Sequence, residues 1–250
     1  MSGHSKWSTI KRKKGAEDAK RGKIFTRLGR DITMAARDGG GDENANPRLK
    51  LAIAKAKAAN MPKDNIERAV LRGTGGLGGE EMSEITYEGY GTDGVAFVVE
   101  VLTDNKNRTL AEIKHVFNRS GGSLASAGSV LWQFEQQGYI ALNSDGVDFD
   151  EVFMVAAEAG ADDVSSEDDA IEVYTPREMF SAVEQALTSA GYAVQDSELR
   201  WQAKNETELA PDKALQNMRL MEALEELDDV QSVASNLMIT DAVVEAFETA

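Results

Sequence analysis

A glycine-rich segment, residues 73–79, divides this sequence into two parts with different hydrophobic periods. It holds five glycines in seven positions. Before it, apolar residues recur every three or four positions, as in amphipathic helices. After it, short apolar runs are separated by turn-forming residues, as in strands joined by hairpins. Because such a segment rarely continues a helix or a strand, we predict a domain boundary here and an α+β fold.

Three helices are predicted before this boundary. The first covers about residues 16–37 and carries an apolar stripe on one side and a cationic stripe on the other. Asn46-Pro47 starts the second, because asparagine is a good cap and proline a good first-turn residue. Met61-Pro62 opens a short third helix, which Gly73 is expected to close in a left-handed conformation. These elements predict a three-helix amino-terminal domain.

Two α+β domains are predicted for the rest of the chain, the third domain being inserted into the second. The second is expected to run strand, strand, helix, strand, strand, and the carboxyl-terminal helix and strand return to it because they are too small to form a domain. Its predicted elements are residues 85–90, 95–102, 109–119, 130–135 and 139–142, with 211–227 and 230–235 from the tail. The predicted domains are residues 1–78, residues 79–142 with 205–250, and the inserted residues 143–204.

Charge is distributed unevenly along the chain. The first 72 residues hold 18 Lys+Arg against 8 Asp+Glu, whereas the remainder holds 9 against 35, and the whole chain has a net charge of −16. A separation of charge on this scale indicates that the amino-terminal part binds a polyanion. The acidic part either avoids that polyanion or contacts a basic partner. An interaction module whose acidic domains bind basic proteins is therefore an alternative function.

Nucleic acid is the partner that this basic part predicts, because its regular phosphates release counterions when lysines and arginines neutralise them. Residues 1–15 are expected to form a basic arm, in which Trp7 either stacks on an exposed base or packs on its own domain. The predicted nucleic-acid-binding residues are Lys6, Trp7, Lys11, Arg12, Lys13, Lys14, Lys20, Arg21, Lys23, Arg27, Arg30, Arg48, Lys50, Lys55, Lys57 and Lys63.

Other classes of protein are disfavoured by composition. There is no cysteine and there are only two histidines, so we expect no thiolate site, no metal, no cofactor and no catalytic residues. No apolar run approaches the ~20 residues of a membrane span, and the first residues lack a secretory signal, so we expect a cytoplasmic protein. One loop, residues 120–129, could cradle an anion with its backbone amides or serve as a tight structural connection.

Six segments of the sequence resemble one family closely. They are Gly3–Trp7, Asp18–Phe25, Asn46–Leu49, Ala59–Ala69, Tyr87–Gly91 and Leu102–Thr109. Together they resemble the YebC/PmpR family over essentially the whole chain. The departures are small: Thr92 and Glu43 each stand where a proline is expected. Both lie in turns, and neither removes a basic residue.

The resemblance implies a three-domain α+β protein of the bacterial cytoplasm, described as a DNA-binding regulator of transcription. Related mitochondrial proteins are translational activators, and members of the family have been linked to ribosomes stalled on proline-rich sequences. Ribosomal RNA is therefore an alternative partner to DNA, and the ribosome an alternative location. The basic residues do not separate the two roles.

Overall fold

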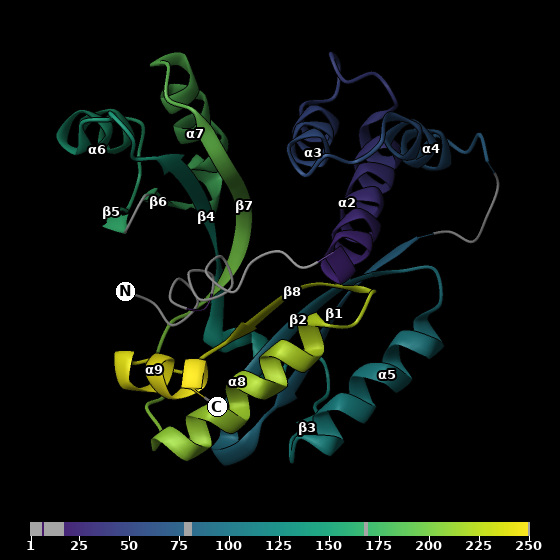
Figure 1. Cartoon of the computed structure of the whole chain (residues 1–250), viewed down its shortest axis with the longest axis vertical. Helices are drawn as coiled ribbons and strands as arrows, with labels where there is room; N and C mark the ends of the chain where they lie inside the picture. The colour runs from purple at the N-terminus through teal and green to yellow at the C-terminus, as the bar shows by residue number, and fades with distance from the viewer. Residues whose placement is uncertain (1–6, 8–17, 78–81, 168–169, 250) are drawn as a thin grey trace. The chain divides into compact units, whose positions relative to one another are not determined.

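The computed structural model describes Trp7 and residues 18–77, 82–167 and 170–249 (Figure 1). The chain forms two compact units, Met1–Leu131 with Asn205–Ala250 and Trp132–Lys204. Helices occupy the amino-terminal part, and the rest contains two four-stranded antiparallel sheets. The segment that forms the second sheet is inserted between strands of the first. The predicted α+β class with an inserted domain is therefore confirmed.

Three helices, α2 (Asp18–Gly39), α3 (Pro47–Ala58) and α4 (Lys63–Gly73), pack together in the first unit (Figure 1). We call them the helical head. Asn46 caps α3 as predicted, because its side chain accepts a hydrogen bond from the amide of Leu49 at 3.0 Å. The buried residues of the head are Ile32, Ala35, Ala36, Leu49, Ala52, Ile53, Ala56, Met61, Ile66 and Ala69. The many alanines let the helices approach closely.

Gly73 has a different role from the one predicted. It remains within α4, and the left-handed backbone follows at Gly75, where φ is 81°. A Cβ atom at Gly73 would lie 2.3 Å from the carbonyl oxygen of Thr33 and 2.7 Å from the Cβ of Ala36. Glycine at this position therefore permits the close contact of α4 with α2.

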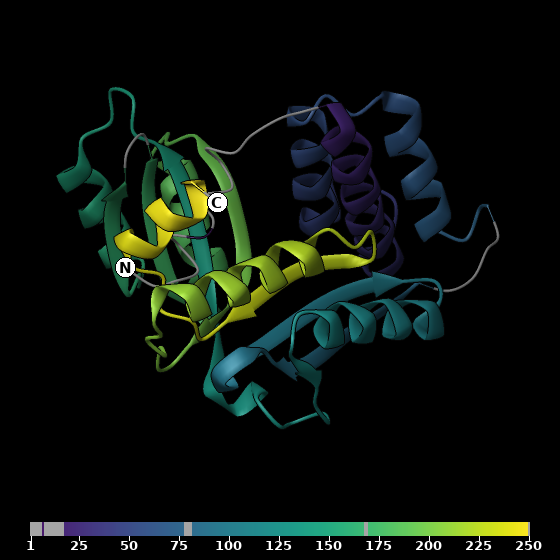
Figure 2. The same ribbon diagram turned by 60° about the horizontal axis from the view of Figure 1, so that its bottom comes forward.

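The first sheet has the strand order β3-β1-β2-β8. Its strands are β1 (Ser83–Tyr90), β2 (Ala96–Thr103), β3 (Ser123–Leu124) and β8 (Val230–Ser235). Helices α5 (Lys106–Arg119) and α8 (Pro211–Glu225) cover one face of it, and α9 (Asp241–Thr249) packs beside α8 (Figure 2). Buried Phe97, Ile113, Phe117 and Met218 join the sheet to these helices. The tail helix and strand return to this sheet as predicted, whereas α9 was not predicted.

The second sheet has the strand order β5-β6-β4-β7 and lies in the second unit. Its strands are β4 (Phe134–Asn143), β5 (Asp163–Glu167), β6 (Ala170–Pro176) and β7 (Val194–Ala203). Helices α6 (Phe149–Glu158) and α7 (Phe180–Ser189) pack on it. Short 3₁₀ turns cover Thr92–Gly94 and Leu131–Gln133 in the connections and Arg177–Met179 before α7. The core of this unit includes Ile140, Val152, Ile171, Val183 and Leu187.

The strand β4 corrects two predictions. Residues 130–135 and 139–142 were predicted as two strands of the first sheet, but β4 is one strand that pairs with β6 and β7 of the second. Gly138 does not form a turn, because it lies inside β4 and pairs with Thr175 and Leu199. A Cβ atom there would lie 2.3 Å from Oγ1 of Thr175 and 2.5 Å from the ring of Phe180. Gly138 marks a close approach inside the strand. The inserted unit consequently begins at Trp132, about eleven residues before the predicted boundary.

Candidate nucleic-acid interface

Helix α3 presents the clearest cationic surface of the head. Its 12 residues include Arg48, Lys50, Lys55 and Lys57 and no acidic residue. The buried stripe of α3 occupies one side, and the cations lie in two rows on either side of it, Arg48 with Lys55 and Lys50 with Lys57. Lys50 and Lys57 are exposed, and Lys55 is half-buried. The helix therefore concentrates positive charge where solvent or a polyanion can reach it.

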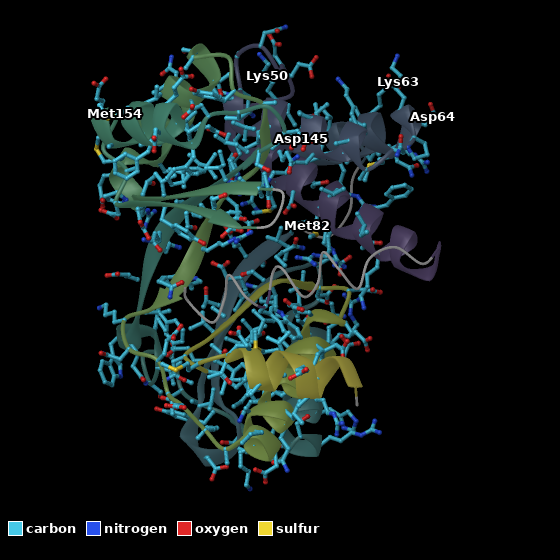
Figure 3. The ribbon with its side chains drawn as sticks, turned by 60° about the vertical axis from the view of Figure 1, so that its left-hand side comes forward. Lys50, Lys63, Asp64, Met82, Asp145 and Met154 are labelled. Carbon is cyan, nitrogen blue, oxygen red and sulfur yellow. The ribbon has the colours of Figure 1, made fainter. Side chains whose placement is uncertain are left out.

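Arg48 and Lys63 each form an ion pair at the surface. Arg48 lies 2.8 Å from Asp38, and Lys63 lies 3.3 Å from Glu67 on α4. The Arg48 side chain is 55% exposed and that of Lys63 87%. Exposed pairs of this kind contribute little stability, so either cation can exchange its carboxylate for a phosphate at small cost. Figure 3 shows Lys50 and Lys63 projecting outward from the helical head.

The cationic stripe of α2 has a different use. Arg27 donates to the carbonyl oxygen of Gln231, and Arg30 donates to that of Asp228 and to the carboxylate of Asp229. These acceptors belong to or precede β8, so both arginines join the head to the first sheet. The prediction that Arg27 and Arg30 contact nucleic acid is therefore not kept. Lys23 on the same helix is half-buried.

Asp229 is the centre of this junction. Its side chain is 2% exposed, and it accepts hydrogen bonds from Arg30 at 2.5 Å and Arg108 at 2.8 Å. The hydroxyls of Thr103 and Thr109 donate to the same carboxylate at 3.0 Å and 2.5 Å. Burial raises the pKa of Asp229, but the bonds from Arg108, Thr109, Arg30 and Thr103 together lower it below its ordinary value. Asp229 is therefore held as a carboxylate between two arginines.

Trp7 lies in the hydrophobic core of the first unit. It is 2% exposed, its indole N–H donates to Glu225 at 3.1 Å, and its ring meets Phe247 edge-on with centroids 5.6 Å apart. A ring in this position is not available to stack on a base. Of the two alternatives considered for Trp7, packing on its own domain describes the structure, and the stacking role is not kept.

Seven predicted residues have side chains outside the described part of the chain. Lys20 and Arg21 lie in the first turn of α2, but their side chains are not described. The arm residues Lys6, Lys11, Arg12, Lys13 and Lys14 lie outside the described residues altogether. Their contribution to binding remains a prediction from the sequence.

Two family models match the chain. The model described as the TACO1/YebC protein N-terminal domain matches residues 5–76, and the model described as the TACO1/YebC second and third domain matches residues 82–237. The chain belongs to the TACO1/YebC family. The resemblance indicated by its signature segments is thus confirmed.

Relatives within the TACO1/YebC family align along nearly their full length. A probable transcriptional regulatory protein of Desulforapulum autotrophicum is 50% identical over 246 residues, 98% of this chain and 100% of the relative. Another so named, from Neisseria gonorrhoeae, is 51% identical over 240 residues, 96% of this chain and 99% of the relative. The crystal structure of a conserved hypothetical protein from Aquifex aeolicus superposes with a TM-score of 0.83 at 41% identity, covering 90% of this chain and 93% of that one.

One TACO1/YebC signature segment has a clear structural role. Residues 102–109 supply Thr103, Arg108 and Thr109, all of which donate to Asp229. Asn105 in the same segment caps α5 by accepting from the amide of Arg108 at 3.1 Å. The segment therefore builds the junction rather than a binding surface.

The end of the loop at residues 120–129, with the two residues that follow it, binds a carboxylate that belongs to the protein. The carboxylate of Glu88 on β1 accepts from the amides of Gly128 at 2.5 Å, Val130 at 2.7 Å and Leu131 at 2.8 Å. Burial raises the pKa of Glu88, but these three backbone hydrogen bonds lower it below its ordinary value. At the end of this loop, Gly128 has the structural role of the two alternatives.

The Glu88→Gln variant is expected to lose about 2 kcal/mol of unfolding free energy at neutral pH, because bonds to a charged acceptor are replaced by weaker ones. The contribution is present above the ordinary glutamate pKa and is lost as pH falls through the lowered folded value. Denaturant titration at neutral and acidic pH measures both effects. Glu84→Gln, at an exposed position of β1, is the control. Equal stability of the Glu88 variant and the parent at neutral pH would contradict the assignment.

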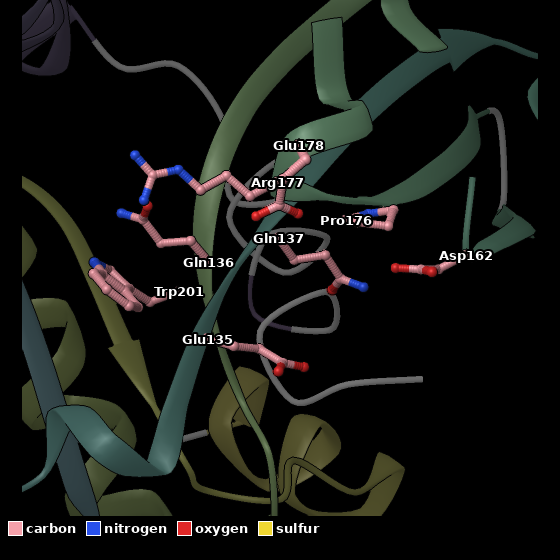
Figure 4. Close-up of a pocket in the computed structure, with 8 residues that line it drawn as sticks. All are labelled: Glu135, Gln136, Gln137, Asp162, Pro176, Arg177, Glu178 and Trp201. Atoms are coloured by element: carbon pink, nitrogen blue, oxygen red, sulfur yellow. The ribbon is translucent and has the colours of Figure 1, made fainter. Parts of the chain in front are cut away.

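A pocket of about 510 Å³ lies in the second unit (Figure 4). It is lined by Glu135, Gln136, Gln137, Asp162, Pro176, Arg177, Glu178 and Trp201. Three carboxylates against one arginine give it a negative character, so it does not suit a phosphate. Within the described residues no group of three His, Asp or Glu side chains is placed to hold a metal ion, and none of the helices there is long and apolar enough to cross a membrane.

Proposed function

We propose that this protein is a DNA-binding regulator of transcription that contacts the phosphate backbone through α3 and the basic segments around it. The observation that carries the proposal is the surface of α3, with its four cations and no acid. The proposed contacts are Lys23, Arg48, Lys50, Lys55, Lys57 and Lys63, with the arm residues Lys6, Lys11, Arg12, Lys13 and Lys14 and the adjoining Lys20 and Arg21. Phosphate contacts of this kind fix position on the duplex without reading its sequence.

Two further observations favour DNA. The relatives from Desulforapulum and Neisseria are named probable transcriptional regulatory proteins. Helices α3 and α4 are joined by only four residues, 59–62, with Asn60 in the left-handed region at φ 59°. A short turn of this length is typical of helix-turn-helix motifs, in which the second helix enters the major groove.

RNA is a second candidate, and one observation favours it. Helix α4, which would enter the groove, exposes Asp64 and Glu67 beside its cations. Carboxylates at a groove repel the flanking phosphates, whereas α3 alone suits contacts with the backbone of structured RNA. The corresponding role is a translation factor that acts on ribosomal RNA and relieves stalling at proline-rich sequences.

Crosslinking in cells, followed by sequencing of the attached RNA and DNA, separates the two candidates. Enrichment of promoter DNA supports regulation of transcription. Enrichment of ribosomal RNA supports the translation factor and overturns the proposal of DNA.

The Lys50→Gln, Lys57→Gln double variant is expected to bind nucleic acid more weakly and with less dependence on salt. Each lost phosphate contact makes the slope of log affinity against log salt shallower by about 0.9 on duplex DNA and about 0.7 on a single strand. Fluorescence anisotropy over a series of salt concentrations measures the slope. Arg177→Gln with Lys204→Gln, two exposed cations of the second unit, removes the same charge as a control. An unchanged slope in the α3 variant would contradict the proposal that α3 contacts the phosphate backbone.

The proposed role places the protein in the cytoplasm and assigns it no enzymatic reaction. The absence of cysteine suits a reducing compartment, and the names of the relatives describe regulators. No cofactor is required for phosphate contacts made by lysine and arginine.

A further inference from the structure

Helix α5 carries an unexpected concentration of positive charge. Beyond residue 72 the chain has 9 Lys+Arg against 35 Asp+Glu. An even spread would place fewer than one of these cations on the 14 residues of α5, yet the helix holds four, Lys106, Arg108, Lys114 and Arg119. Its only acid is Glu112. Four of the nine cations in the acidic part of the chain thus lie on one helix of the first unit.

Lys114 and Arg119 lie away from the buried stripe of α5, whereas Lys106, seven residues before Ile113, lies in line with that stripe at the exposed start of the helix. Ile113 and Phe117 are fully buried against the sheet, whereas Lys114, His115 and Arg119 are all exposed. A rotation of 100° per residue places His115 and Arg119 opposite the buried stripe, with Lys114 at its flank. Among the described carboxylates, none forms an ion pair with Lys114 or Arg119. Their charge is therefore presented to solvent.

Stability of the helix does not account for this distribution. Arg119 lies in the last turn of α5, where the helix dipole favours a cation. Lys106 lies in the first turn, where the same dipole disfavours one. Solubility does not require cations either, since the chain already has a net charge of −16.

The junction at Asp229 connects α5 to the helical head. One carboxylate accepts from Arg30 of the head and from Arg108 of α5. Both elements belong to the same compact unit. Once one surface of a protein holds a ligand, a second surface of the same molecule binds it with a smaller loss of entropy, because the second contact is intramolecular.

We propose that the outward face of α5, formed by Lys114, His115 and Arg119, is a second contact for the phosphate backbone of the nucleic acid bound by the head. This inference rests on the proposed function. The recognised chemistry is a row of phosphates, which RNA and DNA share. Arg108 is a positioning residue, since its guanidinium is already bonded to Asp104 and Asp229.

The test is the Lys114→Gln, Arg119→Gln double variant of the full chain. Its binding to a labelled duplex DNA and to a labelled single-stranded RNA, both of mixed sequence, is measured by anisotropy across salt concentrations. Loss of two phosphate contacts is expected to make the slope of log affinity against log salt shallower by about 1.8 on the duplex and about 1.4 on the single strand. Whichever probe shows the change identifies the nucleic acid that reaches α5.

Two controls make the outcome decisive. Lys114→Arg with Arg119→Lys retains the charge and is expected to retain the slope, and an unchanged unfolding midpoint shows that the fold is intact. The control with Arg177→Gln and Lys204→Gln is expected to leave the slope unchanged. A parent-like slope in the α5 variant, together with a shallower slope in the α3 variant, overturns this inference and leaves the proposed function standing. Parent-like slopes in both variants overturn both. Equal losses in the α5 variant and the second-unit control also overturn the inference, because net charge alone would explain them.

Discussion

Replacing Asp229 by alanine is expected to lower the free energy of unfolding by about 3 kcal/mol, the lower end of the range for breaking a buried ion pair. The variant leaves Arg30 and Arg108 without their shared carboxylate and removes the acceptor of Thr103 and Thr109. The lower end applies because Arg108 is 44% exposed and regains water. Denaturant titration at neutral pH measures the loss.

Asp38→Ala is the matched control for this variant. Asp38 also pairs with two arginines, Arg37 at 3.1 Å and Arg48 at 2.8 Å, but it is 41% exposed. Its removal is expected to cost less than about 1 kcal/mol. If both variants lost the same small amount, the junction would not stabilise the fold.

The contribution of Asp229 should also depend on pH. Its pKa in the folded protein lies below the ordinary value, so folding favours the ionised form. The resulting stability is fully present above the ordinary aspartate pKa of about 3.9 and is lost as pH falls through the folded value. The difference between the parent and Asp229→Asn is therefore expected to stay constant from neutral pH to about pH 5 and to shrink in stronger acid.

Reversing the charge of Lys11, Arg12, Lys13 and Lys14 to glutamate is expected to weaken nucleic-acid binding by at least about 100-fold at moderate salt. Four cations are replaced by four anions, so phosphate contacts are exchanged for repulsion. Anisotropy titration with duplex DNA and with RNA measures the change.

The sequence predicts an exposed arm, so the fold is expected to survive the reversal, since substitutions at exposed positions change stability little. An unfolding midpoint equal to that of the parent is the control for this. Glutamine at the same four positions is a second control, and its loss of affinity should be smaller. Binding retained by the glutamate variant would contradict the proposal that the amino-terminal part grips a polyanion.

Helical period predicted the elements of the head, but it could not decide which cationic face meets solvent. Both α2 and α3 carry cations at helical spacing on their polar side, so the two helices cannot be distinguished by their sequence pattern. The acceptors of Arg27 and Arg30 lie 204 and 199 positions away. Trp7 likewise bonds to Glu225, 218 positions along the chain. Contacts at such separations leave no local pattern. The sequence alone therefore could not show that Arg27 and Arg30 bond within the protein, nor decide between the two alternatives for Trp7.

Glycine was similarly ambiguous. Gly138 lies between the strands predicted at residues 130–135 and 139–142, whereas in the structure it lies inside β4, where Thr175 and Phe180 leave no room for a side chain. The neighbours that decide between the two meanings come from β6 and from the segment that begins α7. The cations of α5 are visible in the sequence, but a net charge summed over residues 73–250 conceals them among the many acidic residues. Counting charge helix by helix would have found them.

The position of β8 has a consequence for synthesis of the chain. Phe97 and Val98 of β2 pair with Ser235 and Ala234, so the edge of the first sheet stays open while more than a hundred further residues are being translated. The inserted unit has its own sheet and core and can fold during that interval. Until β8 emerges, Arg27 and Arg30 lack the acceptors that bind them in the finished protein. The nascent head therefore carries a larger cationic surface than the mature one, in the immediate vicinity of the ribosome's own RNA.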